Sequence, residues 1–237
     1  MTSHSGNEIQ ITFQGIWRGV RKMFALSLFI IPFGMAFGVA AIESGMSVIQ
    51  AITMSVLVFS GAAQFASIDM WSSSSYVSLF LVVLAVSARH ILLGAALSPW
   101  VNKLGRPTRL SALSVLSDAN FADCFSAFRA GERDVGRLVG GGLTLWATWV
   151  IGTVIGAFAG EAFGDLDRFG IDVLMPSYFA VLVLMQWRVE WEGVKTYLPA
   201  IVASLVAVLG LYLLPTGWNV VVAALSGGLV GGLTYGR

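Results

Sequence analysis

Residues 24–41 read FALSLFIIPFGMAFGVAA and contain no charged side chain. Residues 196–214, TYLPAIVASLVAVLGLYLL, have the same character. Each run approaches the roughly 20 apolar residues that cross the hydrocarbon core of a bilayer. Neither run shows the one-sided, 3.6-residue pattern of a helix on the surface of a soluble protein. Both runs therefore predict membrane-spanning helices.

The composition supports this prediction. Of the 237 residues, 57% are hydrophobic and 11% are charged, whereas roughly a quarter of the residues in a soluble domain are charged. We therefore predict an all-α, polytopic membrane protein of the cell membrane. Its seven hydrophobic segments are expected at 24–42, 48–70, 76–98, 138–160, 171–187, 196–214 and 218–235.

Several classes of function are disfavoured by the sequence. A single cysteine, Cys124, excludes an internal disulfide and a multi-cysteine metal site. A net charge of +1 gives no basic field for nucleic acid. The two histidines, His4 and His90, cannot form a zinc protease motif, and we find no nucleophile elbow and no phosphate-binding loop. We expect no enzymatic activity, no metal and no cofactor.

The N-terminus is expected in the cytoplasm. Residues 1–23 are polar at first and then form an amphipathic stretch, 13–23, which predicts an interfacial helix ahead of a retained first span. Its three basic residues favour the cytoplasmic side. In the second half, the connection 161–172 is mainly acidic, while basic residues occur at 129–137 and at 188–195. The second half therefore reads as four spans that return to the cytoplasm.

The first half presents a problem of parity. Three full spans from a cytoplasmic N-terminus would leave the basic residues of 103–109 outside. Either segment 48–70 is broken or re-entrant around Ser60-Gly61-Ala62, or 108–129 crosses the membrane despite its two aspartates. The sequence leaves both alternatives open.

A weak internal repeat is also present. The motif Gly34-Met35-Ala36-Phe37-Gly38 resembles Gly152-Thr153-Val154-Ile155-Gly156, and Leu97–Asn102 resembles Leu214–Asn219 at a similar offset. Many secondary transporters are built from two repeated halves. We therefore predict one transport domain, 24–237, with halves at about 24–102 and 138–236 joined by a linker helix at about 108–129.

Glycines and prolines punctuate the apolar segments. Glycines recur at four-residue spacing, which favours close packing of helices in lipid over contact with a substrate. Pro32 and Pro176 lie inside or at the start of apolar segments, where each leaves a carbonyl without its helical partner. Each proline predicts either a packed kink or a helix break whose backbone groups hold a substrate.

Two polar positions stand out within the apolar segments. Ser60 and Gly61 precede Gln64 in the middle of segment 48–70, and a buried glutamine either joins helices or binds an amino or carboxylate group. Arg89 and His90 lie between two apolar runs. An arginine costs at least about 2.5 kcal/mol at the bilayer centre. Arg89 can offset this cost by binding a substrate carboxylate, by pairing with an acidic residue of the chain, or by extending its side chain to the membrane interface. His90 is either a proton carrier or a buried imidazole with a structural role.

The polar stretch 114–123 includes Asp118 and Asn120. If 108–129 is buried, Asp118 is a proton relay or the ionic partner of Arg89. If 108–129 is a surface helix, Asp118 is a solvated charge or a helix cap. Asn120 is included among the candidate substrate or translocation residues.

In this order and spacing, Gly61-Ala62-Ala63-Gln64-Phe65, Arg89–Gly94 with Leu97-Ser98-Pro99, and Ser117-Asp118 with Phe121-Ala122 resemble the AzlC-type large subunit of branched-chain amino-acid exporters. The resemblance covers about residues 14 to 236. It implies export of leucine, isoleucine, valine and sometimes methionine, driven by protons, together with a small membrane subunit of the AzlD type. The chain departs from the family pattern at Ser87 and Ala119, which bear on the substrate or the coupling.

The leading hypothesis is a secondary transporter. Groups around Gly61 and Gln64 form part of the substrate site, Arg89 holds a carboxylate, and His90 and Asp118 carry or gate protons. A membrane scaffold, in which Arg89 and Asp118 form only an internal pair, is the main alternative. A membrane-embedded enzyme is a weaker one, because the sequence offers no nucleophile or metal cluster.

Overall fold

The computed structural model describes residues 9–68, 70–71, 76–163, 194–214 and 218–235. They form the helices α1 Phe13–Glu43, α2 Val48–Leu57, α3 Gly61–Ile68, α4 Tyr76–Ser87, α5 Arg89–Val101, α6 Arg106–Ser114, α7 Asp118–Arg129, α8 Gly136–Phe163, α10 Val194–Leu213 and α11 Trp218–Tyr235. Among the described residues, three stretches are long and apolar enough to cross a membrane: α1, α4 with α5, and α8. The predicted all-α polytopic membrane fold is confirmed. Segment 171–187 and Pro176 lie outside the described residues.

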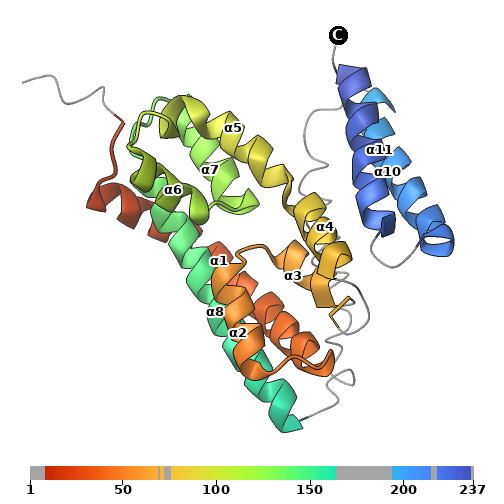
Figure 1. Ribbon diagram of the computed structural model, residues 1–237. Coiled ribbons are helices and arrows are strands. Elements are labelled where there is room, and N and C mark those ends of the chain that lie inside the picture. The colour runs from red at the N-terminus through yellow and green to blue at the C-terminus, as the bar shows by residue number, and fades with distance from the viewer. Residues whose placement is uncertain (1–8, 69, 72–75, 164–193, 215–217, 236–237) are drawn as a thin grey trace, which may run out of the picture.

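Two long helices, α1 and α8, run side by side in the same direction (Figure 1). Glycines bring their backbones close together. A Cβ atom at Gly34 would lie 2.6 Å from the carbonyl oxygen of Trp149, and one at Gly152 would lie 2.5 Å from that of Ile31. A carbonyl of the opposing backbone cannot move aside as a flexible side chain can. The glycines of this pair therefore serve packing, as predicted.

The two glycine motifs that suggested a repeat contact each other. Gly34 and Gly38 of α1 face the backbone of Trp149 and Thr153, while Gly152 and Gly156 of α8 face the backbone of Ile31 and Met35. Gly34 thus lies next to Gly152, and Gly38 lies next to Gly156. The repetition of the complete halves stays a prediction.

Helix α1 differs from its prediction in two respects. It continues from Phe13 to Glu43, so the stretch 13–23 is not separated from the first span. Gly15 and Gly19 in this stretch are buried against the start of α8. The helix also continues through Pro32, so the predicted helix break does not occur there. Close packing on α8 holds the chain on both sides of the proline.

Segment 48–70 is broken, which was one of the two predicted alternatives. Helix α2 runs antiparallel to α8, because Ser55 contacts Thr153 and the next residue, Val56, contacts Trp146. After α2 ends at Leu57, α3 begins at Gly61 against Trp149, which lies halfway along α8. Ten residues of helix span about 15 Å, half of a hydrocarbon core. At this break the chain therefore lies level with the midpoint of α8.

The return crossing is made by α4 and α5. The end of α5, at Leu97 and Val101, packs with Val135 and Leu138 at the start of α8. Because α1 and α8 begin on the same side and α4–α5 returns to that side, α2–α3 makes no full crossing. This re-entrant arrangement resolves the problem of parity in the first half.

The predicted single linker helix at 108–129 is wrong. The stretch forms two helices, α6 and α7, with a break at Val115–Ser117. Ser117 and Asn120 form a capping box that starts α7. Such a cap satisfies backbone donors at a new helix start and so favours a break in the chain there.

The C-terminal helices α10 and α11 pack on each other, and α11 also contacts α4 (Figure 1). Gly227 lies close to Ala203 and Pro199 of α10. A Cβ atom at Gly228 or Gly232 would meet nothing within 4 Å in the described part of the chain. For these two glycines the structure shows no packing role.

Candidate functional site

The break between α2 and α3 is the first part of the candidate site. Ser60 and Gly61 at the break are partly exposed, whereas Gln64, one turn into α3, is completely buried. A Cβ atom at Gly61 would lie 2.7 Å from the ring of Trp149. Glycine at this position therefore lets the indole ring lie directly against the start of α3.

A chain of hydrogen bonds fixes the orientation of the Gln64 amide. Thr153 Oγ1 lies 3.1 Å from the carbonyl oxygen of Trp149, which only accepts, so the threonine hydroxyl donates to it. Thr153 must then accept from Ser55 at 2.7 Å, and Ser55 accepts from Gln64 Nε2 at 2.9 Å. The Gln64 amide oxygen therefore points away from this chain of donors.

Two buried oxygen atoms at the break lack a hydrogen-bond partner among the described residues. Gln64 Oε1 and Ser60 Oγ are inaccessible to solvent and have no hydrogen-bond partner among the described residues. Trp149 and Phe65 lie nearby with ring centroids 6.3 Å apart, and Phe37 completes the aromatic group. A buried amide oxygen is costly without a donor, so this position is suited to receive one.

Arg89 and Asp118 form the second part of the candidate site. Arg89 Nη2 lies 3.1 Å from Asp118 Oδ2, and the two side chains are 29% and 32% exposed. The ion pair with Arg89 is one of the four roles predicted for Asp118, and its role in translocation stays a prediction. The contact is made by Nη2, and within the described chain Arg89 Nε has no hydrogen-bond partner. This leaves a donor for a second carboxylate.

The helix is interrupted where these residues begin. Helix α4 ends at Ser87, Ala88 lies between the helices, and α5 starts at Arg89. His90 Nδ1 lies 3.2 Å from the carbonyl oxygen of Ser87. Since a carbonyl only accepts, Nδ1 carries the proton and Nε2 is the nitrogen that can exchange one. The sequence predicted 76–98 as one uninterrupted segment.

Asn120 holds the start of α7 through its side-chain amide. Its amide accepts from the Ser117 backbone at 2.7 Å and donates to the carbonyl oxygens of Val115 at 2.8 Å and Leu138 at 3.2 Å. The side chain is buried and ties the start of α7 to α8. These contacts give Asn120 a structural role, and its role in binding or translocation stays a prediction.

The predicted site residues fall into two groups. Ser60, Gly61 and Gln64 gather at the α2–α3 break, and Arg89, His90 and Asp118 gather where α5 meets α7. Between the described residues of the two groups, no hydrogen bond or ion pair is found. Sequence reasoning missed Ser55 and Thr153, hydroxyl residues in apolar segments that orient Gln64.

The family described as AzlC protein matches residues 25–163, more than half of the chain. The chain belongs to the AzlC family. It is 30% identical over 224 residues to an uncharacterized membrane protein of Archaeoglobus fulgidus, with coverage of 91% of this chain and 93% of that protein. This membership confirms the resemblance seen in the sequence.

Two other relatives of this AzlC-family chain carry more informative names. It is 27% identical over 225 residues to the inner membrane protein YgaZ of Escherichia coli, covering 91% of this chain and 87% of YgaZ. It is 25% identical over 204 residues to the branched-chain amino acid transport protein AzlC of Bacillus subtilis, covering 81% and 78%. No solved structure matches the chain. Family membership supports a cell-membrane protein that transports a small molecule.

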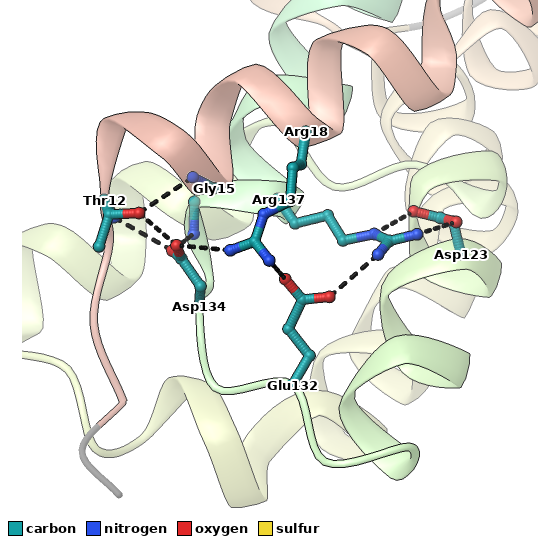
Figure 2. A network of polar contacts seen from close by, with 8 residues as sticks. Thr12, Gly15, Arg18, Asp123, Glu132, Asp134 and Arg137 are labelled. Carbon is teal, nitrogen blue, oxygen red and sulfur yellow. Dashed lines mark hydrogen bonds and ion pairs between the residues drawn. The ribbon is translucent and has the colours of Figure 1, made fainter. Parts of the chain in front are cut away.

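The AzlC-family chain also contains an ionic network that sequence reasoning missed (Figure 2). Arg137 binds both oxygens of Asp123 at 2.7 Å and one oxygen of Glu132 at 2.9 Å. Arg18 joins Glu132 at 3.1 Å and Asp134 at 3.2 Å, which ties α1 to the start of α8. The dense alternation of acidic and basic residues at 132–137 was the available signal.

Replacing Arg137 by alanine is expected to destabilise the folded protein by about 3 kcal/mol, because it leaves the largely buried Asp123 carboxylate without its cation and leaves Glu132 with Arg18 alone. The measurement is the apparent melting temperature of the purified protein in detergent. Arg133→Ala, in the same connection but exposed, is the control and should melt like the wild type. Equal melting temperatures for the two variants would contradict a structural role for the network.

The single cysteine, Cys124, is buried in α7, outside the three membrane-crossing stretches. Burial, helped by the nearby Asp123 carboxylate, raises the pKa of its thiol to about 12. At pH 8 roughly one thiol in ten thousand is then ionised, and the thiolate is the reactive form. Maleimide should leave folded protein unlabelled and should label it after denaturation in detergent. Rapid labelling of the folded protein would contradict this environment.

Proposed function

We propose that this chain is the large subunit of a secondary transporter that exports branched-chain amino acids across the cell membrane. The supporting observation is Arg89: it lies at a helix interruption, pairs with Asp118 through a single contact, and has a buried Nε without a hydrogen-bond partner among the described residues. A guanidinium group has five N–H donors, so Arg89 can bind a substrate carboxylate as well as Asp118. The transport name of the Bacillus subtilis relative supports amino acids as the substrate.

The re-entrant segment supports the same proposal. In secondary transporters, substrates and coupling ions bind near the bilayer midplane, where broken helices offer unpaired backbone groups. The α2–α3 break lies halfway along α8, beside a packed cluster of apolar side chains that includes Phe37, Phe65 and Trp149. The break supplies this environment with no ionised side chain among its described residues 58–65.

Protons are the proposed coupling ion. His90 has one ring nitrogen held by Ser87 and another that can exchange a proton. Asp118 lies beside Arg89 at 3.1 Å, so a substrate carboxylate and Asp118 compete for one guanidinium group. Export driven by an inward proton gradient requires antiport, in which the transporter takes up a proton from outside for each amino acid that it releases there.

Two further features belong to the proposal. The N-terminus lies in the cytoplasm, in agreement with the basic residues at 18–22. A small membrane subunit of the AzlD type completes the transporter.

The test is efflux of radiolabelled leucine, valine and methionine from preloaded cells that express this chain with the neighbouring small subunit. Accelerated efflux that a protonophore abolishes is the expected result. Efflux equal to that of cells without the chain, for all three amino acids, would exclude the proposed substrates. Acceleration that persists with the protonophore would exclude proton coupling.

A further inference from the structure

From the hydrogen bonds around Gln64 we infer that the α2–α3 break binds the protonated amino group of the substrate. The inference rests on the proposed function and assigns one part of the substrate to one part of the site. It also chooses between the two possibilities for Gln64, an amino group or a carboxylate.

The first argument is the direction of the hydrogen bonds. The series from Gln64 to Ser55, Thr153 and the Trp149 carbonyl is satisfied in full only if Gln64 donates through Nε2. Its Oε1 atom is then an acceptor and cannot donate to a carboxylate. The same series joins three helices, α2, α3 and α8, so rotating the amide would leave Ser55 without its donor.

The second argument is burial. Gln64 is completely buried, and its Oε1 atom has no hydrogen-bond partner among the described residues. Ser60 Oγ, one helical turn away at the partly exposed break, is a second oxygen without a partner there. A group with several N–H donors satisfies both oxygens, and a protonated amine carries three.

The third argument is electrostatic. The carbonyl end of α2 brings a negative partial charge to the break and the amide end of α3 brings a positive one, so the helix ends favour neither sign of charge. The Trp149 ring lies against Gly61, and aromatic rings attract cations. Residues 58–65 contain no basic side chain that would repel an amine or attract a carboxylate. These features favour a cation with hydrogen-bond donors.

The experiment measures binding of three ligands to the purified full-length chain in lipid nanodiscs. Leucine has both charged groups, 3-methylbutylamine keeps only the ammonium group, and 4-methylpentanoate keeps only the carboxylate. Gln64→Leu is expected to weaken binding of leucine and of 3-methylbutylamine at least tenfold, and to change that of 4-methylpentanoate less than twofold.

A second pair of variants guards against simple misfolding. Ser55→Ala removes the partner that orients the Gln64 amide and should weaken both amines severalfold. Ser67→Ala removes another buried hydroxyl, whose bond stays within its own helix at Ala63, and should leave all three affinities unchanged. Equal effects of the two serine variants would overturn the inference.

Other outcomes separate this inference from the proposed function. If leucine is transported but Gln64→Leu weakens binding of the carboxylate ligand only, the inference is wrong and the transporter proposal stands. If 3-methylbutylamine binds through Gln64 but no amino acid is transported, the proposed function fails alone. If the wild type binds neither amine, the ammonium site is excluded.

Discussion

Replacing Arg89 by alanine is expected to lower leucine efflux by about tenfold to a hundredfold while the protein remains folded in the membrane. A hydrogen bond to a charged group contributes about 1.5–3 kcal/mol, which corresponds to such a factor in binding. Asp118 would lose its partner, but about a third of its side chain is exposed. The measurement is efflux normalised to the amount of protein in the membrane, with Arg106→Ala, an exposed arginine at the start of α6, as the control.

The double exchange Arg89→Asp with Asp118→Arg distinguishes the transporter from a scaffold. It keeps an ion pair between α5 and α7 but moves the guanidinium group to the other helix. If the pair only holds the helices together, the exchange restores what the single substitution removes. We expect a folded protein that does not transport leucine. Full recovery of efflux would contradict a substrate contact for Arg89.

The second large effect is expected at the contact between α1 and α8. A Cβ atom at Gly156 would overlap the carbonyl oxygen of Met35, which belongs to the backbone of the opposing helix. Gly156→Ala must therefore push the two helices apart, at an expected cost of about 3 kcal/mol. The measurement is the fraction of protein that elutes as a single folded species after heating in detergent.

Gly94 provides the matched control, because it also lies inside a helix but a Cβ atom there would meet nothing within 4 Å. Gly94→Ala should be neutral or stabilising by up to about 1 kcal/mol, since alanine favours the helix more than glycine does. If both variants tolerate heating equally, glycine packing does not determine the stability of the α1–α8 pair.

Patterns that lie within short stretches of sequence predicted much of the fold. Charge-free runs located α1 and α8, and the small polar residues around Ser60 offered a break in segment 48–70 as one of two alternatives. The interruption at Ala88 was not predictable in the same way. Apolar side chains continue on both sides of it, and Ala88 keeps helical backbone angles, φ −56° and ψ −27°. The sequence there contains neither proline nor glycine to signal a break.

Contacts between residues far apart in the sequence were harder to predict. Arg89 and Asp118 could be paired because unpaired charges are rare in apolar segments and each needs a partner. Ser55 and Thr153 carry no such signal, since a hydroxyl group in a membrane helix usually bonds to its own backbone. Their role depends on the parallel packing of α1 and α8 and on the re-entrant path of α2. The capping role of Asn120 could not be predicted from the sequence, because it depends on α7 beginning at Asp118.

The most direct test of the account is counterflow of labelled leucine in liposomes that contain the purified chain and its small subunit. Counterflow needs a binding site that faces both sides in turn and does not depend on an ion gradient. We predict that labelled leucine accumulates transiently in liposomes preloaded with unlabelled leucine, and that Arg89→Ala abolishes this accumulation. Liposomes with the folded wild-type complex that accumulate no more leucine than empty liposomes would contradict the claim that this chain transports leucine.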